Sequence, residues 1–488
     1  MISLFMIFFL NLSYLTGTAH AGTPVLLPMP VVETLPSGLK VAWFIDNRLP
    51  VVDLSLIVQA GHRNDPFGKS GTVELVAASL DRGAGGMTAQ QLSRAIDFLG
   101  GIHYSSVLDD SLIVGMHGLA TDTSGLLEIL GKLVLHPDFL KAQVETQRDR
   151  LLDRWSHLED YGGALVSAAY RRIFGIAAQE SQEFGNDLYG RSGLSSIREL
   201  KGVSREDVEQ FYRKYFTVKN SILVVVGRVD PAVFRPEITA VFGAWGVGDG
   251  AKEIIPLEFS KVTSRVIRSR SKNKSLIRKR GSIVLLDRPL LTQAQIRLGF
   301  RVPSVRSSEY YPLLVANALL GGYFGSRLNT EIRDKLALTY GITSAITHNK
   351  EFGEFTISTA TRSELVGPLI QKVTDVLELL KKGTIQDSEV EIAQAYLEGG
   401  FPLSASTLEA VASRWLTGFV FNLGAGYLNE FVSKIHAVTP LEVQSAIQNN
   451  FDLKNRVVVI AGDAKEIKKS LAMSKFKSIR LVGVSDLR

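Results

Sequence analysis

The hydrophobic positions of the chain fall into two series that follow the same plan. Alternating apolar and polar residues predict half-buried strands at "LPVVDLSLIVQAG" (49–61) and "LTQAQIRLGFRVP" (291–303). Each strand is followed by an apolar helical segment, "GKSGTVELVAASL" (68–80) and "SEYYPLLVANALL" (308–320). A glycine-rich turn and a second amphipathic helix come next, "TAQQLSRAIDFLGG" in the first series and "SRLNTEIRDKL" in the second. The pattern therefore predicts two similar halves.

An internal repeat strengthens this interpretation. "VSREDVEQFYRKYFTVKNSILVVVG" (203–227) aligns without a gap with "VTPLEVQSAIQNNFDLKNRVVVIAG" (438–462), at an offset of 235, the difference between 438 and 203. In each copy a Ser or Thr caps an amphipathic helix, Lys-Asn forms a turn, and a β-branched run predicts a buried strand that ends at Gly. The matching positions are Val203/Val438, Ser204/Thr439, Val208/Val443, Phe216/Phe451, Lys219/Lys454, Asn220/Asn455 and Gly227/Gly462.

These elements predict an α+β fold. It consists of two homologous α/β-sandwich halves, each a mostly antiparallel sheet with helices packed on one face. Long amphipathic helices such as "LVGPLIQKVTDVLELLKKG" complete each half. Along the chain we expect a signal peptide at 1–21, an N-terminal domain at 22–245, a basic linker at 246–281 and a C-terminal domain at 282–488.

The net charge of +6 comes from one local tract. "KVTSRVIRSRSKNKSLIRKR" (261–280) holds nine Lys or Arg and no acid, so the rest of the chain carries −3, the difference between +6 and nine. A solvated linker face is the simplest explanation, and contact with anionic lipid or an acidic partner surface is the alternative. Without a basic domain or a base-reading motif, we expect no nucleic-acid partner.

The first residues predict export. "MISLFMIFFLNLSYLTGTAHAG" combines an apolar core with small residues and an A-x-A site, so we expect signal-peptide cleavage after Ala21. The usual positive n-region is missing, because no Lys or Arg precedes Lys40. An uncleaved membrane anchor is the alternative, although the apolar run is shorter than the ~18–20 residues that a span needs. An exported chain of 488 residues with no Cys must be stabilised by packed cores, and a bacterial periplasm fits best.

The sequence offers few groups for catalysis of its own. It has no Cys nucleophile and no G-x-S-x-G elbow. None of its eight His pairs with another at a spacing of three or four residues, which a metal-binding helix requires. "HNKEF" (348–352) supplies H-x-x-E without a second His, and we expect it to form a surface turn. The His residues are His20, His62, His103, His117, His136, His157, His348 and His436.

Several stretches, in their order along the chain, carry a resemblance to a known family. They are "GHRNDPFGKSG" (61–71), "GAGGMTAQQLSRAIDFLGG" (83–101), "NDLYGRSGLSSIRELKGVSREDVEQFYRKYFTVKNSILVVVGRVDP" (186–231) and "LLGGYFGSRLNTEIRDKLALTYGI" (319–342). The chain resembles the insulinase/pitrilysin-like zinc peptidases, or inverzincins, and specifically their two-domain subunits. The order of the stretches is more specific to the family than any one of them.

The resemblance implies a degenerate zinc site. Active members carry H-x-x-E-H on the first helix, where two His bind zinc and Glu acts as the base. Alignment on "GKSG" places these three positions at Glu74, Ala77 and Ala78, and the family's third ligand, a Glu, aligns at or near Arg154. Ala has no donor atom, and a lone Glu74 cannot hold an ion that needs three protein ligands. We therefore expect no metal in this chain and zinc in a partner subunit.

The resemblance also implies a substrate-binding pair in the second half. In the family an Arg and a Tyr seven residues apart reach toward the zinc site and bind the substrate backbone or the tetrahedral intermediate. "IRDKLALTYG" supplies Arg333 and Tyr340 at that spacing. Guanidinium and phenol groups are donors suited to a peptide carbonyl or an oxyanion. From spacing alone, the two would be an exposed helix Arg and a half-buried Tyr.

A glycine-rich loop precedes this pair. Some family members contact substrate with the corresponding loop, and here it contains Gly321, Gly322 and Gly325, with Tyr323 and Phe324 where smaller residues are expected. Glycine permits close approach of the backbone, either to a substrate or to a neighbouring helix. Substrate contact and helix packing therefore both explain the loop.

The leading functional hypothesis is a non-catalytic, substrate-binding subunit of an exported zinc peptidase complex. A homologous partner would supply H-x-x-E-H, while this chain would hold an extended peptide, for instance by β-strand addition to a sheet edge. The alternatives are a structural, core-type subunit and a peptide-binding homodimer of the same fold without protease activity. Retention of both Arg333 and Tyr340 argues against a pure scaffold.

Overall fold

The computed structural model describes most of the chain. The described residues are 26–180, 189–190, 193–245, 283–383, 385–424, 426–474, 476 and 478–487. The predicted signal peptide with its cleavage site after Ala21, and the predicted basic linker 246–281 with its tract 261–280, lie outside these residues.

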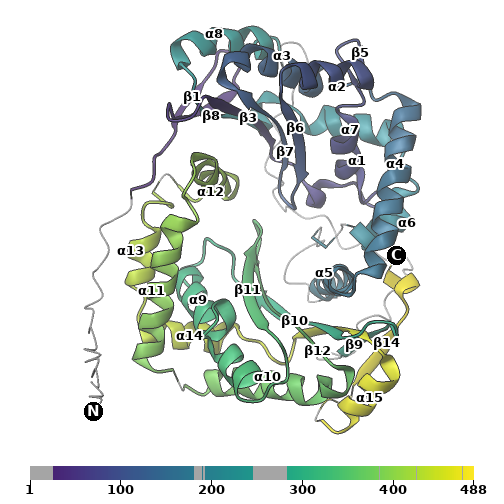
Figure 1. The fold of residues 1–488 in the computed structure, drawn as a ribbon, viewed down its shortest axis with the longest axis vertical. Helices are drawn as coiled ribbons and strands as arrows, with labels where there is room; N and C mark the ends of the chain where they lie inside the picture. Colours follow the sequence, from purple (N-terminus) through teal and green to yellow (C-terminus); the bar gives the residue numbers. More distant parts are fainter. Residues whose placement is uncertain are drawn as a thin grey trace, which may run out of the picture.

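The first half of the chain builds one six-stranded sheet, in the order β1-β2-β8-β3-β7-β6 (Figure 1). All neighbours are antiparallel except β2 and β8. The strands are β1 (Val31–Thr34), β2 (Lys40–Ile45), β3 (Val51–Val58), β6 (Ile102–Val107), β7 (Leu112–Leu119) and β8 (Ser221–Gly227). The helices are α1 (Thr72–Ser79), α2 (Ala89–Phe98), α3 (Thr123–Leu135), α4 (Lys141–Ser156), α5 (Gly162–Glu180), α6 (Ile197–Leu200), α7 (Arg205–Tyr215) and α8 (Pro231–Phe242). A short ribbon pairs β4 (Gly83–Ala84) with β5 (Met87–Thr88).

The second half builds another six-stranded sheet, in the order β11-β12-β10-β13-β9-β14. Here β9 runs parallel to both of its neighbours, and the other pairs are antiparallel. The strands are β9 (Ile283–Asp287), β10 (Ala294–Val302), β11 (Ile342–His348), β12 (Gly353–Thr361), β13 (Val457–Gly462) and β14 (Ile479–Val482). The helices are α9 (Tyr310–Asn317), α10 (Val366–Lys381), α11 (Asp387–Leu403), α12 (Leu408–Phe421), α13 (Phe431–His436), α14 (Pro440–Asn450) and α15 (Ala464–Ala472). The predicted α+β fold is confirmed.

The repeat predicted from the sequence appears as matching local structure. The capping box at the start of α7 uses Ser204 and Asp207, and that of α14 uses Thr439 and Glu442. The residue after each helix is a Phe with nearly the same backbone, φ −82°, ψ 83° in α7 and φ −81°, ψ 81° in α14. Each helix then leads into a fully buried central strand, β8 or β13.

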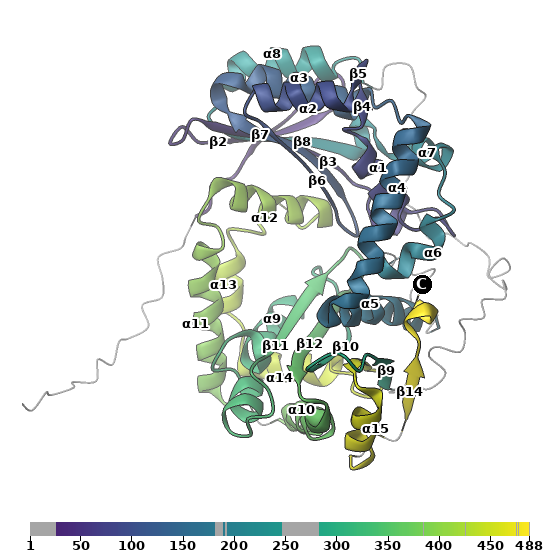
Figure 2. The same cartoon turned by 45° about the vertical axis from the view of Figure 1, so that its right-hand side comes forward.

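Each half contributes one helix to the sheet of the other half: α12 packs on the first sheet and α5 on the second, which we call the helix exchange. The face of each sheet that is turned away from most helices of its own half, here called the inner face, looks toward the other half (Figures 1 and 2). On the first sheet Ile222, Val224 and Val226 of β8 pack in a cluster with residues of α12. On the second sheet the repeat-equivalent residues Val457, Val459 and Ala461 of β13 pack in a cluster with residues of α5. Since both faces of β8 and β13 are covered, these strands are continuously apolar.

Tyr170 of α5 shows how closely this helix approaches the second sheet. A Cβ on Gly299 of β10 would lie 2.3 Å from the Tyr170 hydroxyl, so only Gly leaves room for it. The hydroxyl is buried and has no hydrogen-bond partner among the described residues. Burial accordingly raises the pKa of Tyr170 well above its ordinary value.

We predict that Tyr170→Phe stabilises the protein by about 1 kcal/mol, because it removes a buried hydroxyl that makes no hydrogen bond. Tyr212→Phe is the matched control, because the Tyr212 hydroxyl donates to the carbonyl of Val134 at 2.7 Å. The control is expected to destabilise by about 1 kcal/mol. Urea unfolding of the three proteins measures both changes, and a shift of the two variants in the same direction would contradict the prediction.

The β11–β12 connection corrects one prediction. "HNKEF" (348–352) forms the expected turn, but the turn packs against the first half and only Glu351 stays exposed. The backbone N–H of Lys350 donates to Asp110 at 3.1 Å, and Glu351 pairs with Arg63 at 3.1 Å. Phe352 is buried. The polar residues of the turn predicted an exposed position. Their hydrogen-bond and ion-pair partners, Asp110 and Arg63, are more than 200 positions away in the sequence and could not be identified from it.

No helix among the described residues is long and apolar enough to cross a membrane.

Candidate functional site

Helix α1, which carries the aligned zinc positions, is fixed at its N-terminus by a buried carboxylate. Asp65 accepts hydrogen bonds from the backbone N–H groups of Gly71 at 2.7 Å and Val73 at 2.8 Å. Gly71 adopts φ +95°, and a Cβ there would lie 3.0 Å from the Trp155 ring of α4. The turn therefore requires glycine, and it holds α1 close against α4.

Glu74 lies between a histidine and an arginine. Its Oε1 is 3.4 Å from Nε2 of His62, which lies in the short 3₁₀ turn His62–Asn64 before α1. Burial raises the pKa of Glu74, and the charge of Arg154 on α4 opposes that shift. Burial also lowers the pKa of His62 to about 4, so its imidazole is neutral at pH 7. The structure thus brings the aligned positions on α1 and α4 into one site.

This site does not fit a zinc ion. Ala77 is buried in the core and Ala78 packs against it, and neither offers a donor atom. The guanidinium of Arg154 cannot ligate a cation. Within the described ranges, no group of three or more His, Asp or Glu side chains could hold a metal. His62 was not predicted to belong to this site, because it precedes Glu74 by twelve positions and so escapes any helical-spacing test.

The predicted glycine-rich loop is enclosed by two π-helical segments. They are η7 (Ala318–Gly322) and η8 (Asn329–Asp334), with extended backbone at Tyr323 between them. The sequence predicted an amphipathic helix over "SRLNTEIRDKL"; a helix does form from Arg327, and it widens to π-helical geometry from Asn329. π-Helical turns are frequent at functional sites.

The glycines of this loop serve packing and not unusual dihedrals. None of Gly321, Gly322 and Gly325 has a positive φ. A Cβ on Gly321 would lie 2.7 Å from Oγ of Ser344, so this glycine allows η7 to lie directly on β11. Asn329 holds the turn by donating to the carbonyl of Tyr323 at 3.2 Å.

Arg333 and Tyr340 lie on η8 and on the loop after it, and their environments differ. The guanidinium of Arg333 stacks on the ring of Phe324, 3.4 Å from its centroid, and its Nε donates to Asp334 at 2.7 Å. Both Nη groups have no partner among the described residues. Tyr340 is 96% exposed and makes no hydrogen bond within the described part of the chain. No direct contact joins the two side chains in this region, so the structure presents one ordered donor and one free phenol.

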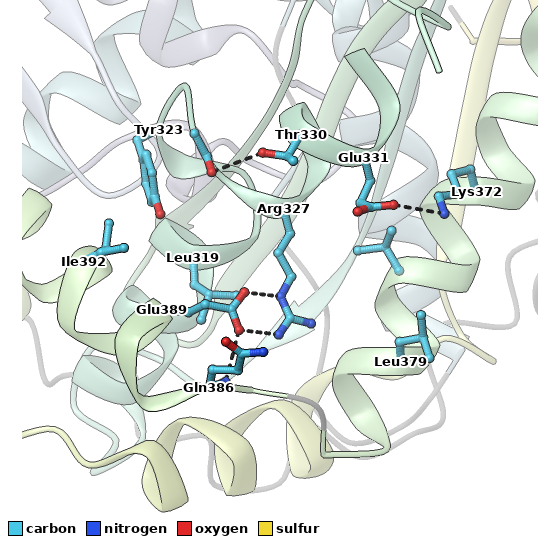
Figure 3. Close-up of a pocket in the computed structure, with 12 residues that line it drawn as sticks. Leu319, Tyr323, Arg327, Thr330, Glu331, Lys372, Leu379, Gln386, Glu389 and Ile392 are labelled. Carbon is cyan, nitrogen blue, oxygen red and sulfur yellow. Dashed lines mark hydrogen bonds and ion pairs between the residues drawn. The ribbon is translucent and has the colours of Figure 1, made fainter. Parts of the chain in front are cut away.

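A cavity of about 480 Å³ opens beside the same loop, between α10, α11 and the π-helical segments (Figure 3). Its charged groups are already paired: Arg327 binds Glu389 through two contacts of 2.6 and 2.5 Å, and Lys372 lies 3.2 Å from Glu331. The remaining wall includes the apolar side chains Leu319, Val376, Leu379 and Ile392. The cavity was not foreseen, because its walls come from three separate segments between Leu319 and Ile392 that only the tertiary fold brings together.

The sequence matches two family models. Residues 41–176 match "Insulinase (Peptidase family M16)", and residues 202–397 match "Peptidase M16 inactive domain". The first match contains the degenerate positions from Glu74 to Arg154. The second contains Arg333 and Tyr340.

Similar proteins with known sequences are uncharacterized zinc proteases of bacteria. The chain is 24% identical over 392 residues to one from Mycobacterium leprae, which covers 78% of this chain and 80% of the relative. It is 20% identical over 392 residues to the uncharacterized zinc protease YmxG of Bacillus subtilis, and this match covers 78% of this chain and 86% of YmxG.

Two solved structures share the fold. One is a peptidase M16 inactive domain from Pseudomonas fluorescens, with a TM-score of 0.73 and 20% identity, covering 89% of this chain and 97% of that one. The other is a protease from Helicobacter pylori, with a TM-score of 0.74 and 18% identity. This match covers 89% of the present chain and 100% of the Helicobacter chain.

Proposed function

Because the chain belongs to the insulinase family, peptidase family M16, we propose that it is the non-catalytic, substrate-binding subunit of an exported zinc peptidase complex. One observation carries this proposal. The aligned zinc positions hold Glu74, Ala77, Ala78 and Arg154, while the second half retains an arginine whose two Nη groups are open. The chain has thus lost the metal but kept a donor for peptide carbonyls.

A homologous partner chain with intact H-x-x-E-H would supply the zinc and the general base. Division of the site between two chains is chemically workable, because catalysis depends only on the geometry of the assembled groups. Arg333 and Tyr340 would then bind the peptide backbone or the oxyanion that develops at the partner's metal. The N-terminal apolar segment supports placement of the complex outside the cytoplasm.

The sheets end in four edge strands, β1, β6, β11 and β14, and we consider β6 and β11 for an extended peptide. Among the described residues β6 pairs only with β7 and β11 only with β12, so each presents one unpaired row of backbone donors and acceptors. Peptides that add as a strand to such an edge gain affinity from main-chain hydrogen bonds and specificity from alternate side chains. This mode suits a subunit that binds many sequences.

The test is purification of the mature chain from periplasm under gentle conditions, with identification of any co-purifying protein. We expect the isolated chain to bind no stoichiometric zinc and to cleave no peptide. We expect the complex with an H-x-x-E-H homologue to cleave peptides faster than that homologue alone. A homodimer that binds peptides without a zinc-bearing partner would favour the alternative of a peptide-binding protein. Zinc-dependent cleavage by the chain alone, unaffected by Glu74→Ala, would overturn the proposal.

A further inference from the structure

A set of polar side chains lies on the inner face of the first sheet, beside its free edge. It comprises Asp53 and Ser55 of β3, Tyr104 of the edge strand β6, and His117 of β7. The strand register aligns Tyr104 with Gly115 of β7 and Gly115 with Ser55, while His117 aligns with Asp53. The alternate residues of β3, such as Leu54 and Leu56, are fully buried in the core on the other face. These polar groups therefore belong to the face that looks toward the second half.

Gly115 lets the ring of Tyr104 lie flat across the sheet. A Cβ on Gly115 would lie 2.3 Å from Cζ and 2.5 Å from the hydroxyl of Tyr104, so any other residue would push the ring away. The Tyr104 hydroxyl reaches two strands inward, 2.5 Å from Oγ of Ser55 and 2.8 Å from Oδ1 of Asp53. One face of the ring rests on β7, and the ring is only partly buried. An aromatic surface is thus fixed beside the edge strand.

The carboxylate of Asp53 is held in place by two hydroxyl groups. It accepts hydrogen bonds from Ser55 at 2.6 Å and from Tyr104, and its side chain is 14% exposed. Burial raises the pKa of Asp53, and the two hydroxyl donors oppose that shift. Among the described residues no Lys or Arg pairs with Asp53, and the only basic side chain in contact is His117, with Nδ1 at 3.8 Å.

The charges around Asp53 leave this end of the inner face negative. Glu409, in the first turn of α12, adds its field to that of Asp53. Arg48 also lies near Glu409, but it is paired with Asp46 at 2.6 Å. The inner face of the second sheet is different, because Arg297 and Arg301 of β10 stack on aromatic rings there. The carboxylate of Asp53 thus lacks a Lys or Arg neighbour within the described residues, whereas Glu354 on the second sheet lies beside Arg297 and Arg301.

We propose that the exposed face of Tyr104, whose hydroxyl is bound to the Asp53 carboxylate, forms a subsite for the Lys or Arg side chain of an extended peptide added to β6. This proposal rests on the proposed function and specifies its substrate class. Directly opposite residues of antiparallel strands have Cβ atoms about 4.5–5.5 Å apart, so a peptide side chain on the inner face would lie beside Tyr104. An ammonium or guanidinium group placed over the ring gains a cation–π contact. Asp53 lies on β3, the third strand from the added peptide, so its carboxylate acts through its charge and through its hydrogen bond with the Tyr104 hydroxyl, and not by direct contact.

The experiment measures binding of fluorescent peptides to the full mature chain by anisotropy. Peptides of about ten residues share one neutral sequence, and a single lysine is moved through successive positions. Each lysine peptide has a matched peptide with norleucine at that position. In one register we expect lysine to bind about tenfold more tightly than norleucine. Asp53→Asn is expected to reduce this difference and leave norleucine binding unchanged.

Two further variants separate the subsite from general effects. Asp97→Asn removes one exposed carboxylate from α2, on the far side of the sheet, and is expected to keep the lysine preference. Tyr104→Phe keeps the ring over Gly115, loses only the hydroxyl, and is expected to retain part of the preference. Equal binding of lysine and norleucine peptides in every register would overturn the subsite alone. Failure of all peptides to bind would instead overturn the proposed peptide-binding function.

Discussion

The fourfold variant Glu74→His, Ala77→Glu, Ala78→His and Arg154→Glu is expected to bind about one zinc ion per chain, compared with a background level in the natural protein. Positions 74 and 78 are one helical turn apart on α1, and residue 154 already faces position 74 from α4. Because Asp65 and Gly71 fix the start of α1, the new ligands would need little rearrangement of the backbone. Metal analysis after dialysis measures the zinc content.

The control retains Ala78 and changes only the other three positions. Of its new side chains only those at 74 and 154 occupy aligned ligand positions, while position 77 is that of the general base, and a zinc site requires three protein ligands. We therefore expect it to stay near background. Circular dichroism establishes that each variant is folded, which matters because Ala77 is 5% exposed and has little room for Glu. A folded fourfold variant without zinc would show that these positions no longer have zinc-site geometry.

Arg333→Ala is expected to lower kcat/KM of the reconstituted complex by about 100-fold, which is typical for loss of one donor to a developing oxyanion. The reason is geometric: Phe324 and Asp334 hold the guanidinium in place and leave both Nη groups open within the described region. Arg333→Lys is expected to recover little of this activity, because an ammonium group cannot reproduce the planar stack with two parallel donors.

Lys335→Ala is the matched control for Arg333→Ala. It removes a cation from the turn that follows η8. Its side chain is 61% exposed and, in the part of the chain that the structure describes, pairs with Glu331. We expect activity within about twofold of the natural chain, since exposed ion pairs contribute little. Equal losses in both variants would mean that Arg333 acts through the net charge of the loop and not as a specific donor.

The helix caps and the buried central strands could be predicted, because both depend on residues that are close together in the sequence. Ser204 and Thr439 cap the helices that the repeat predicted, and the β-branched runs after Phe216 and Phe451 form the buried central strands. The helix exchange could not be predicted. The apolar face of α5 predicts that this face is buried, but it does not identify the sheet against which the helix packs. The same holds for the apolar face of α12.

The candidate site was predictable only where alignment could identify positions. Glu74 and Arg154 were expected near one another, and the electrostatic coupling between them agrees with that. The contact of His62 with Glu74 depends on a turn between two elements. The position of Tyr104 depends on a glycine in a neighbouring strand, and strand alternation cannot foresee such a contact.

The exchange of α5 and α12 also bears on how such a chain could have arisen. If the halves descend from one duplicated unit, that unit standing alone would have exposed an apolar sheet face, the counterpart of Ile222 and Val224 in one half and of Val457 and Val459 in the other. A symmetric pair of identical units solves this problem, because each copy can lend its helix to the other, as in a domain-swapped dimer. The present chain has the architecture of such a dimer after gene fusion. Once fused, its two units no longer needed to stay alike, and one could lose its metal while the other kept its arginine.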